Sequence, residues 1–391
     1  MGSKRRLLFL MPSLRGGGAE RTLINLLHKI DPARYHVDLI VVSKKGPYVE
    51  QVPEYVNISY LYQNDYIARI LMYLHSKFRL MWFFEKKMKK IEKKYDMGIS
   101  FLDCYVTDLL FMTEKIEKRI AFIHSSYRTH ENYERFYSKE KLNRRLRAER
   151  YSRLDAIYFV SEDSMKEFID VMGVYPEMGV VYNLIDREAV IRKSEEPFEL
   201  LENETFAFSA VGSLMEVKGF DRLIRAAAIV KDKGYSFTIH LAGTGAEEEK
   251  LRALICELGL EEEVYLYGFL PNPYPLMKQS DVFVMSSKSE ALPTVLCEAM
   301  MLGVPTLVTD CSGCRGIVDH GEFGLMAEQD DHDYAGKMMR YMDEPELLVQ
   351  YREKSLERAE IFDDEKVLNR YYNIFDGNVF EYPKSKVLEE R

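Results

Sequence analysis

The sequence predicts an α/β protein with two doubly wound, Rossmann-like domains that face each other across a cleft. Its 391 residues are too many for one ordinary hydrophobic core and fit two domains. Short apolar runs alternate with segments whose apolar residues recur every three or four positions, which is typical of parallel strands joined by helices. A charged stretch at residues 186–204 has no strand pattern, so we expect the domains at residues 1–190 and 191–362.

Ten strands are expected, five in each domain. They are at residues 7–11, 37–42, 97–101, 120–123, 156–160, 206–211, 237–242, 264–267, 282–286 and 306–308. Helices are expected between them, for example at residues 221–231 and 247–257. A helix at about residues 363–378, beginning at Asp363, is expected to pack back on the first domain, and residues 379–391 to form a polar tail. Because ligands of such sheets bind outside the carboxyl ends of the strands, residues that follow strands are the candidates for chemistry.

The composition is typical of a soluble globular protein, with 47% hydrophobic and 30% charged residues. No apolar run approaches the roughly 20 residues that cross a bilayer. Five scattered cysteines indicate reduced thiols and a cytoplasmic location. Cys311 and Cys314 form an isolated C-x-x-C pair without a histidine cluster, which is interpreted as a loop with two small residues, not as a zinc site.

The net charge of −9 is unevenly distributed. Residues 1–190 carry 32 basic and 25 acidic side chains, a net of +7, whereas residues 191–391 carry 22 and 38, a net of −16. The acidic half argues against nucleic-acid binding. The basic half, with its interleaved apolar residues, indicates anionic lipid or phosphate partners.

Three glycines, Gly16, Gly17 and Gly18, directly follow the first expected strand and precede an amphipathic helix. Glycine lets the backbone approach a ligand closely, and the N–H groups of a helix start attract anionic or polyhydroxyl groups. The pattern is neither G-x-G-x-x-G nor a Walker loop. A plain tight turn is the alternative interpretation.

Two further residues follow expected strands. His124 comes directly after the strand at residues 120–123 and could bind a sugar hydroxyl or stabilise positive charge at a reacting carbon; capping of the strand is the alternative. Lys218 follows a turn opened by Gly212 and precedes a helix. A lysine in this place can offer its ammonium group to a diphosphate, although most lysines are simply solvated.

The stretch SEALPTVLCEAM at residues 289–300 places Glu290 in a loop and Glu298 inside the helix that follows. Pro293 is expected in the first helical turn. The N–H groups of Thr294 and Val295 would then point out of the helix start, where they can receive a phosphate. Glutamates placed in this way straddle a ligand and do not converge on one metal ion. A capped helix with solvated glutamates is the alternative.

With these motifs in this order, the chain resembles the retaining glycosyltransferases of family 4, which have the GT-B fold. The resemblance covers almost the whole chain and passes through the segments GGGAERTLINL, FIHSSY, YFVSEDS, VVYNLID, VGSLMEVKG, LAGTGAEEEKL, YLYGFL, DVFVMSSKSEALPTVLCEAM, GVPTLVTD and GEFGLM. It implies transfer of a sugar from a nucleotide-sugar, such as a UDP-sugar, held by the second domain to an acceptor held by the first.

The resemblance also implies roles for individual residues. Glu298 would bind the ribose hydroxyls, Lys218 the diphosphate and Glu290 the donor sugar, with His124 beside the anomeric centre; His124 and Glu290 are the catalytic candidates. The implied donor-binding residues are Gly17, Gly18, Gly212, Ser213, Lys218, Gly243, Glu290, Ala291, Leu292, Pro293, Thr294, Val295 and Glu298. The implied acceptor-binding residues are Arg15, Gly16 and Gly17.

The chain departs from the family pattern at several positions. Ser213 stands where family members usually carry an arginine that shares the diphosphate charge, and it can donate only one neutral hydrogen bond. Ala291 stands where glycine is common, Gly316 where a glutamate is usual, and the segment NLID at residues 183–186 lacks the usual glycine. These departures leave open how tightly the chain binds the nucleotide and which donor sugar it uses.

No metal or other cofactor is expected, because Lys218 and the helix start at Thr294 can stabilise the charge of a departing diphosphate. Asp331 and Asp333 match the D-x-D motif with which another glycosyltransferase fold holds a metal, but their surroundings predict the capped start of a helix. In the family the reaction is thought to occur on one face of the sugar, with the leaving phosphate taking the acceptor proton. Glu290 is therefore interpreted as a positioning group and not as a nucleophile.

Residues 66–96 interleave apolar and aromatic side chains, Trp82, Phe83 and Phe84 among them, with nine basic residues. A helix of this kind suits the headgroup layer of an anionic membrane, and a second basic helix is expected at residues 140–153. An ordinary helix with a solvated basic face is the alternative.

The sequence leaves three candidate functions. The first is a glycosyltransferase that is peripheral on the inner face of the plasma membrane and acts on a lipid-linked saccharide in bacterial surface glycan synthesis. The second is a soluble glycosyltransferase with a small-molecule acceptor, and the third is a catalytically silent sugar-nucleotide-binding protein.

Overall fold

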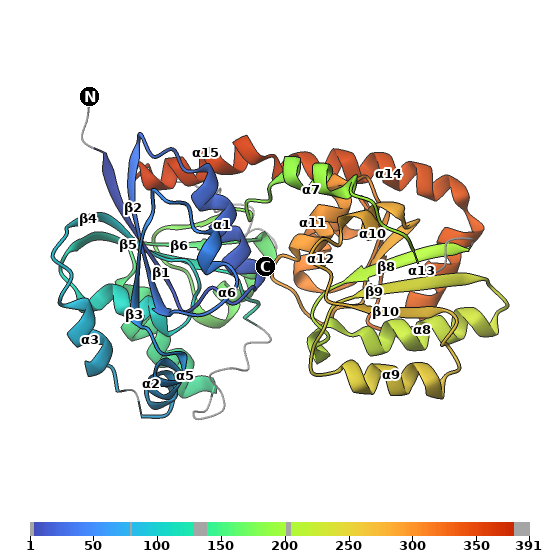
Figure 1. The fold of residues 1–391 in the computed structure, drawn as a ribbon, viewed down its shortest axis with the longest axis horizontal. Helices are drawn as coiled ribbons and strands as arrows, with labels where there is room; N and C mark the ends of the chain where they lie inside the picture. The colour runs from blue at the N-terminus through green and yellow to red at the C-terminus, as the bar shows by residue number, and fades with distance from the viewer. Residues whose placement is uncertain (1–3, 79, 128–138, 201–204, 379–391) are drawn as a thin grey trace. The chain divides into compact units, whose positions relative to one another are not determined.

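The computed structural model describes residues 4–78, 80–127, 139–200 and 205–378. The chain divides into two compact units, one with residues up to Leu184 and from Glu365 onward, the other with Ile185–Asp364. In each unit, helices cover both faces of a parallel sheet (Figure 1). The two predicted parallel sheets are thereby confirmed. The predicted polar tail at residues 379–391 lies outside the described residues.

The first unit contains a seven-stranded parallel sheet in the order β3-β2-β1-β4-β5-β6-β7. Its strands are β1 (Arg5–Met11), β2 (Tyr35–Ser43), β3 (Asn57–Tyr62), β4 (Tyr95–Ser100), β5 (Ile116–Ile123), β6 (Ala156–Phe159) and β7 (Met178–Val180). Its helices are α1 (Gly18–Lys29), α2 (Asp65–Phe78), α3 (Trp82–Met88), α4 (Tyr105–Leu109), α5 (Lys139–Arg145), α6 (Glu162–Met172) and α15 (Asp364–Phe375). The strand order reverses its direction between β1 and β4.

The second unit contains a six-stranded parallel sheet in the order β10-β9-β8-β11-β12-β13. Its strands are β8 (Phe206–Val211), β9 (Phe237–Ala242), β10 (Val264–Gly268), β11 (Val282–Met285), β12 (Thr306–Thr309) and β13 (Leu325–Ala327). Its helices are α7 (Arg187–Ser194), α8 (Phe220–Asp232), α9 (Glu248–Glu257), α10 (Tyr274–Gln279), α11 (Thr294–Met301), α12 (Ser312–Val318), α13 (Asp331–Asp343) and α14 (Pro345–Ala359). Here the strand order reverses between β8 and β11.

All ten predicted strands are present, and three further strands are β3, β7 and β13. Each of the three lies at an edge of its sheet. Strands β7 and β13 have three residues each, and β3 is buried at only one position. Short or half-exposed edge strands carry little hydrophobic pattern, which is why the sequence did not reveal them.

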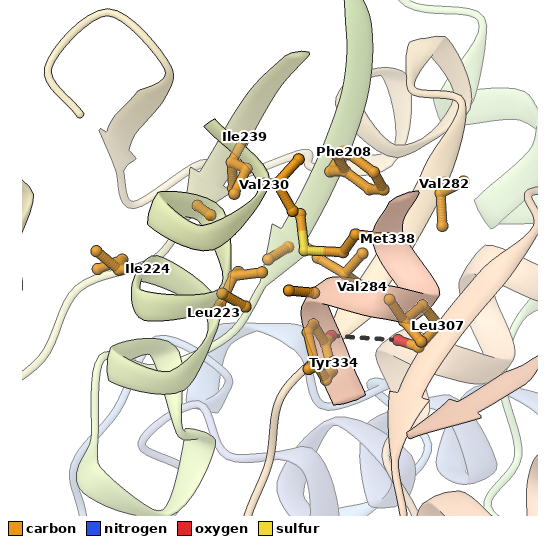
Figure 2. Close-up of a cluster of buried hydrophobic side chains, with 14 of the residues drawn as sticks. Phe208, Leu223, Ile224, Val230, Ile239, Val282, Val284, Leu307, Tyr334 and Met338 are labelled. Carbon is orange, nitrogen blue, oxygen red and sulfur yellow. Dashed lines mark hydrogen bonds between the residues drawn. The ribbon is translucent and has the colours of Figure 1, made fainter. Parts of the chain in front are cut away.

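The core of the second unit forms where helices α8 and α13 pack on the sheet. Figure 2 shows side chains from both helices, Leu223 and Met338 among them, directed towards Phe208 and Val284 of the central strands. All four side chains are buried. The amphipathic spacing that predicted a helix at residues 221–231 therefore marks the face of α8 that covers the sheet.

Helix α15 packs on the sheet of the first unit, although it lies at the other end of the chain. The Phe375 ring is 5.9 Å from that of Phe9 and 5.7 Å from that of Tyr35, centroid to centroid. The Tyr372 hydroxyl donates a 3.1 Å hydrogen bond to the carbonyl of Lys29. The last helix thus completes the hydrophobic core beneath β1 and β2.

The region predicted as one amphipathic helix at residues 66–96 is instead two helices, α2 and α3, followed by the start of β4. Phe84 is fully buried and Phe83 nearly so, because both pack beneath the first sheet. The expectation that both rings face a membrane was therefore wrong. The second basic helix, expected at residues 140–153, is also different from the prediction, because α5 ends at Arg145 and not all of the basic side chains are exposed. Arg150 is buried, and its guanidinium pairs with Asp108 at 2.8 Å.

Replacing Phe375 by alanine should destabilise the first unit by about 3–5 kcal/mol, since it removes a fully buried ring. Urea unfolding followed by the fluorescence of Trp82, the single tryptophan of the chain and a residue of this unit, would measure the loss. Asn369→Ala, on an exposed position of the same helix, should change the unfolding free energy by less than about 0.5 kcal/mol. Equal losses of unfolding free energy in Phe375→Ala and Asn369→Ala would contradict the packing of α15 on the first sheet.

Candidate functional site

Strands β8 and β11 are neighbours in the sheet of the second unit, so the loops that follow them begin side by side. The strand order also reverses between these two strands. At such a reversal the two loops lead to opposite faces of the sheet and leave a crevice at the carboxyl ends of the strands, where ligands of doubly wound folds bind. The first loop contains Gly212, Ser213 and Lys218, and the second contains Glu290. Residues 72 positions apart in sequence are thereby brought together.

Lys218 and Glu290 form an ion pair at this place. The Lys218 Nζ donates to Glu290 Oε1 at 2.6 Å, and the two side chains are only 22% and 12% exposed. The buried Ser287 also donates to Oε1, at 2.8 Å from its Oγ. Both donors use the same oxygen, and among the described residues Oε2 has no hydrogen-bond partner. Glu290 is therefore fixed through one oxygen while the other is available.

Glycines allow the loops around this pair to approach one another. Gly219 has φ of 62°, and a Cβ at this position would lie 2.1 Å from the carbonyl oxygen of Ser286. A Cβ on Gly243 would lie 1.8 Å from the carbonyl oxygen of Gly212. The backbone after β8 is thus packed against the loops after β9 and β11, which sets the position of Lys218.

Helix α11 begins directly after the Glu290 loop. Pro293 is its N-cap and no side chain caps it, so the prediction that Pro293 lies inside the first turn was wrong by one residue. The first amides of a helix, here those of Thr294 and Val295, have no acceptor within the helix. Ala291 and Leu292, between Glu290 and the helix, are buried. Glu298 lies in the second turn, where its Oε1 accepts a 3.2 Å hydrogen bond from the Tyr274 hydroxyl.

The C-x-x-C pair does not lie in a loop, as had been expected, but at the start of α12. Cys311 is the N-cap and Cys314 lies inside the first turn. The hydrogen bond between their side chains lowers the pKa of the Cys311 thiol and raises that of Cys314. Between them, the amide of Gly313 donates to the Glu290 carbonyl at 3.0 Å. This turn therefore fixes the main chain of Glu290, while Lys218 and Ser287 hold its side chain.

The D-x-D residues lie at the start of helix α13, as predicted. Asp330 is the N-cap and accepts 2.9 Å hydrogen bonds from the amides of His332 and Asp333. Asp331 pairs with Arg225 at 2.6 Å. In the part of the chain that the structure describes, no cluster of three or more histidine, cysteine, aspartate or glutamate side chains is arranged to hold a metal ion.

The glycine loop of the first unit leads into α1, with Gly17 as the N-cap. Glu20, three residues later, receives hydrogen bonds from its own amide and from that of Gly17, in the arrangement of a capping box. Burial nevertheless raises the pKa of Glu20. No role for Glu20 was predicted from the sequence, although a glutamate three residues after an N-cap is the usual sequence signal of a capping box. Glu20 makes the loop less suited to an anion than the glycines alone suggest.

Arg15 of the same loop pairs with Asp65, the first residue of α2. Asp65 also accepts a 2.8 Å hydrogen bond from the Ser43 hydroxyl and lies 3.1 Å from Lys45 Nζ. The Ser43 hydrogen bond and the two cations lower the pKa of Asp65 to about 2. The glycine loop is therefore tied to the start of α2.

His124 directly follows β5, and its ring lies beside that of Phe101, tilted by 42° with the centroids 5.0 Å apart. Burial lowers the pKa of His124 to about 3, so the imidazole is neutral at physiological pH. Neither ring nitrogen has a hydrogen-bond partner among the described residues, which does not agree with a strand cap. The loop after it is fixed by the buried Glu167, which accepts hydrogen bonds from the Ser126 hydroxyl at 2.5 Å and the Tyr127 amide at 3.0 Å.

The structure thus gathers the predicted residues in two places. Those gathered in the second unit, around the Lys218–Glu290 pair, are Gly212, Ser213, Lys218, Gly243, Glu290, Ala291, Leu292, Pro293, Thr294, Val295 and Glu298. Those in the first unit are Arg15, Gly16, Gly17, Gly18 and His124. Ser287, Tyr274 and Glu20 were missed, because a single hydroxyl or carboxylate has no sequence pattern that announces its partner.

Comparisons with known proteins match both units. A family profile described as glycosyl transferases group 1 matches residues 192–358, and one described as glycosyltransferase family 4 matches residues 16–189. A Campylobacter jejuni protein named N-acetylgalactosamine-N,N'-diacetylbacillosaminyl-diphospho-undecaprenol 4-alpha-N-acetylgalactosaminyltransferase is 28% identical over 91% of this chain and 95% of its own length. The lipopolysaccharide core biosynthesis glycosyltransferase LpsD of Rhizobium meliloti is 30% identical over 45% of this chain and 51% of its own.

Solved structures match the fold. HepE of Anabaena, crystallised with UDP-glucose, superposes with a TM-score of 0.73 at 18% identity, over 95% of this chain and 99% of its own. The lipopolysaccharide outer core galactosyltransferase WaaB superposes with a TM-score of 0.68 at 20% identity, over 95% and 99%. The arrangement of two parallel α/β sheets is that of GT-B proteins.

Gly219→Ala should cost about 2–5 kcal/mol of unfolding free energy, since the new methyl group meets a backbone oxygen and the left-handed conformation is itself strained. Gly234→Ala is the matched control, because Gly234 also has positive φ but no atom lies within 4 Å of its Cβ position. We expect this control to lose only about 1–2 kcal/mol in urea unfolding. A control as unstable as Gly219→Ala would show that the contact with Ser286 does not constrain the loop.

Proposed function

Because the chain belongs to glycosyltransferase family 4, a retaining family with the GT-B fold, we propose that it transfers a hexosyl or N-acetylhexosaminyl residue from a UDP-sugar to a lipid-linked saccharide in bacterial surface glycan synthesis. The observation that carries the proposal is the ion pair of Lys218 and Glu290 at the reversal of strand order in the second unit. Relatives named for lipid-linked and lipopolysaccharide glycan synthesis support the acceptor class, and HepE, crystallised with UDP-glucose, supports the donor.

The second unit would bind the donor. The Lys218 ammonium and the free amides at the start of α11 are donors for a diphosphate, which needs several hydrogen bonds and positive charge. Glu290 would accept hydrogen bonds from the sugar hydroxyls through Oε2, since Oε1 is already used by Lys218 and Ser287. Glu298, one and a half turns into α11, would bind the ribose hydroxyls.

The chemical step requires stabilisation of the departing diphosphate. The bond between the anomeric carbon and the phosphate oxygen breaks with its electron pair on that oxygen, where Lys218 would oppose the growing charge. The acceptor oxygen bonds to the same face of the sugar and its proton passes to the leaving phosphate. Glu290 is a poor nucleophile here because its charge is neutralised by Lys218, which supports a positioning role. Family 4 enzymes typically use no metal cofactor.

The first unit would bind the acceptor through Arg15 and the glycine loop. The Glu20 carboxylate beside Gly17 favours hydroxyl groups over phosphate at this loop. His124 is neutral and its ring nitrogens have no partner among the described residues, so it can bind a hydroxyl beside the anomeric centre without repelling positive charge there.

Exposed apolar side chains on and after α2 support an anionic membrane surface as partner. Tyr66 is 71% exposed and Trp82 is 64% exposed, and the other exposed large apolar residues of this region are Ile67, Ile70, Tyr73, Phe78 and Leu80. We call this set the α2 surface. Basic side chains such as Arg69 and Lys77 accompany it, so that it suits the headgroup layer on the inner face of the plasma membrane. Among the described helices, none is both long and apolar enough to cross a bilayer.

A soluble enzyme with a small acceptor is the second candidate. It is favoured by 25% identity, over 56% of this chain and 59% of the relative, to an enzyme of Bacillus anthracis named N-acetyl-alpha-D-glucosaminyl L-malate synthase. The third candidate is a catalytically silent sugar-nucleotide-binding protein. It is favoured by Ser213, which stands where family members usually carry an arginine. Transfer to a lipid-linked saccharide, transfer to a small hydroxy acid, or donor binding without turnover would separate the three.

Lys218→Ala should lower kcat/KM for the UDP-sugar by roughly 10²–10³-fold, since it removes the cation that stabilises the leaving diphosphate. The donor would first be chosen by thermal-shift screening of UDP-sugars, and transfer then measured by product formation. Glu290→Gln should retain more activity than Glu290→Ala, because an amide oxygen can still accept a hydroxyl. Lys233→Ala, at an exposed position of the same unit, serves as control. Turnover near the wild-type rate in Glu290→Ala would refute its positioning role.

The double substitution Tyr66→Ala and Trp82→Ala should weaken binding to anionic vesicles by roughly tenfold, because it removes two exposed rings of the α2 surface. Val349→Ala, which changes an equally exposed apolar residue of α14 in the other unit, should have no effect in the same sedimentation assay. Binding of the wild type should also fall between about 0.1 M and about 1 M salt. Vesicle binding that is unchanged by the double substitution would exclude the α2 surface as the contact.

A further inference from the structure

We propose that Tyr274 is a positioning residue that fixes the Glu298 carboxylate for the ribose of the nucleotide. This inference rests on the proposed function, in which Glu298 binds the ribose hydroxyls. Tyr274 lies 24 residues before Glu298 in sequence, at the first position of α10, and its hydroxyl donates to Glu298 Oε1 at 3.2 Å. Both side chains are half-buried, so the pair lies at the surface of the unit, where a ligand can reach it.

The hydroxyl of Tyr274 is itself held in place by a rigid turn. Pro273 and Pro275 flank Tyr274 and restrict the backbone on both sides. The Asn272 Oδ1 accepts from the Tyr274 amide at 3.3 Å, while Asn272 Nδ2 donates to the Lys193 carbonyl at 2.9 Å. Pro275 is buried against the unit. The turn therefore presents the phenol from a fixed backbone.

The geometry matters because a glutamate side chain has three rotatable bonds and loses much conformational freedom when it binds a ligand. A hydrogen bond to Oε1 restricts the carboxylate before the nucleotide arrives and fixes the direction of Oε2. Glu290 shows the same design, since Ser287 and Lys218 both hold its Oε1. In both glutamates of the segment, Oε1 thus accepts a hydrogen bond from a hydroxyl of the same unit.

A merely structural link between α10 and α11 is the competing explanation. Removal of the phenolic oxygen would then change stability slightly and would affect every ligand in the same way. A positioning role predicts instead that the effect is specific for the ribose hydroxyls and disappears when the Glu298 carboxylate is absent. The two explanations differ in nucleotide specificity, which can be measured without knowing the donor sugar.

The test is the dissociation constant of the full chain for UDP, 2′-deoxy-UDP and 3′-deoxy-UDP by isothermal titration calorimetry. Tyr274→Phe should weaken UDP binding about fivefold, the equivalent of one hydrogen bond, and weaken the deoxy analogues less. The preference of the wild type for UDP over these analogues should shrink accordingly. In a Glu298→Ala background, which removes the acceptor, Tyr274→Phe should have no further effect. With the donor sugar identified, Tyr274→Phe should raise KM and leave kcat within about twofold.

Tyr235→Phe is the matched control, because the Tyr235 hydroxyl also donates to a carboxylate of this unit, that of Asp343 at 2.8 Å. It should leave all three affinities unchanged. Equal weakening of the three ligands by Tyr274→Phe, or additive losses with Glu298→Ala, would overturn the positioning role and leave the proposed donor standing. Failure of the wild type to bind UDP would overturn the proposed donor, and the inference with it.

Discussion

The candidate site of the second unit depends on the ion pair between Lys218 and Glu290, which joins the two loops at the reversal of strand order. Both side chains are mostly buried, and a buried charge without a partner would destabilise the loops by several kcal/mol. Each residue therefore allows the other to occupy a place where a ligand can meet it. Gly219 and Gly313 pack the backbones of the two loops tightly enough for the pair to form. The site exists before the ligand because its charges balance one another.

The charges around the candidate binding residues differ between the two units. In the second unit, a cation and a helix start with free amides provide a place for phosphate. In the first unit, the helix start after the glycine loop already carries the Glu20 carboxylate, and the nearby strand end carries a neutral His124. Such surroundings suit hydroxyl groups. The proposed sugar-nucleotide donor and saccharide acceptor would need this division.

Most of the fold could be predicted, since buried parallel strands have continuous apolar runs and the helices between them have regular spacing. The edge strands β3, β7 and β13 could not, because they are short or half-exposed. The division of residues 66–96 into two helices was missed because Phe83 and Phe84 are apolar whether they face lipid or the sheet. Motif residues such as Glu290 could be found from their order along the chain. Ser287 and Tyr274 could not, since their importance comes from a partner that only the fold brings near.

Under the proposed function, Ser213, at the position where the family resemblance implies an arginine, would affect the way the nucleotide is held. While Glu290 is paired with it, Lys218 adds almost no net charge to the site, and the start of a helix contributes only about half an elementary charge. Attraction of a diphosphate is therefore weak by comparison with a site that has two cations. The free energy of binding must come to a larger extent from directional hydrogen bonds to the ribose and the sugar. A carboxylate that a hydrogen bond already holds, as in Glu290 and Glu298, would supply such bonds with little loss of conformational freedom on binding. On this proposal, the hydroxyls of Ser287 and Tyr274 would compensate for the absence of an arginine.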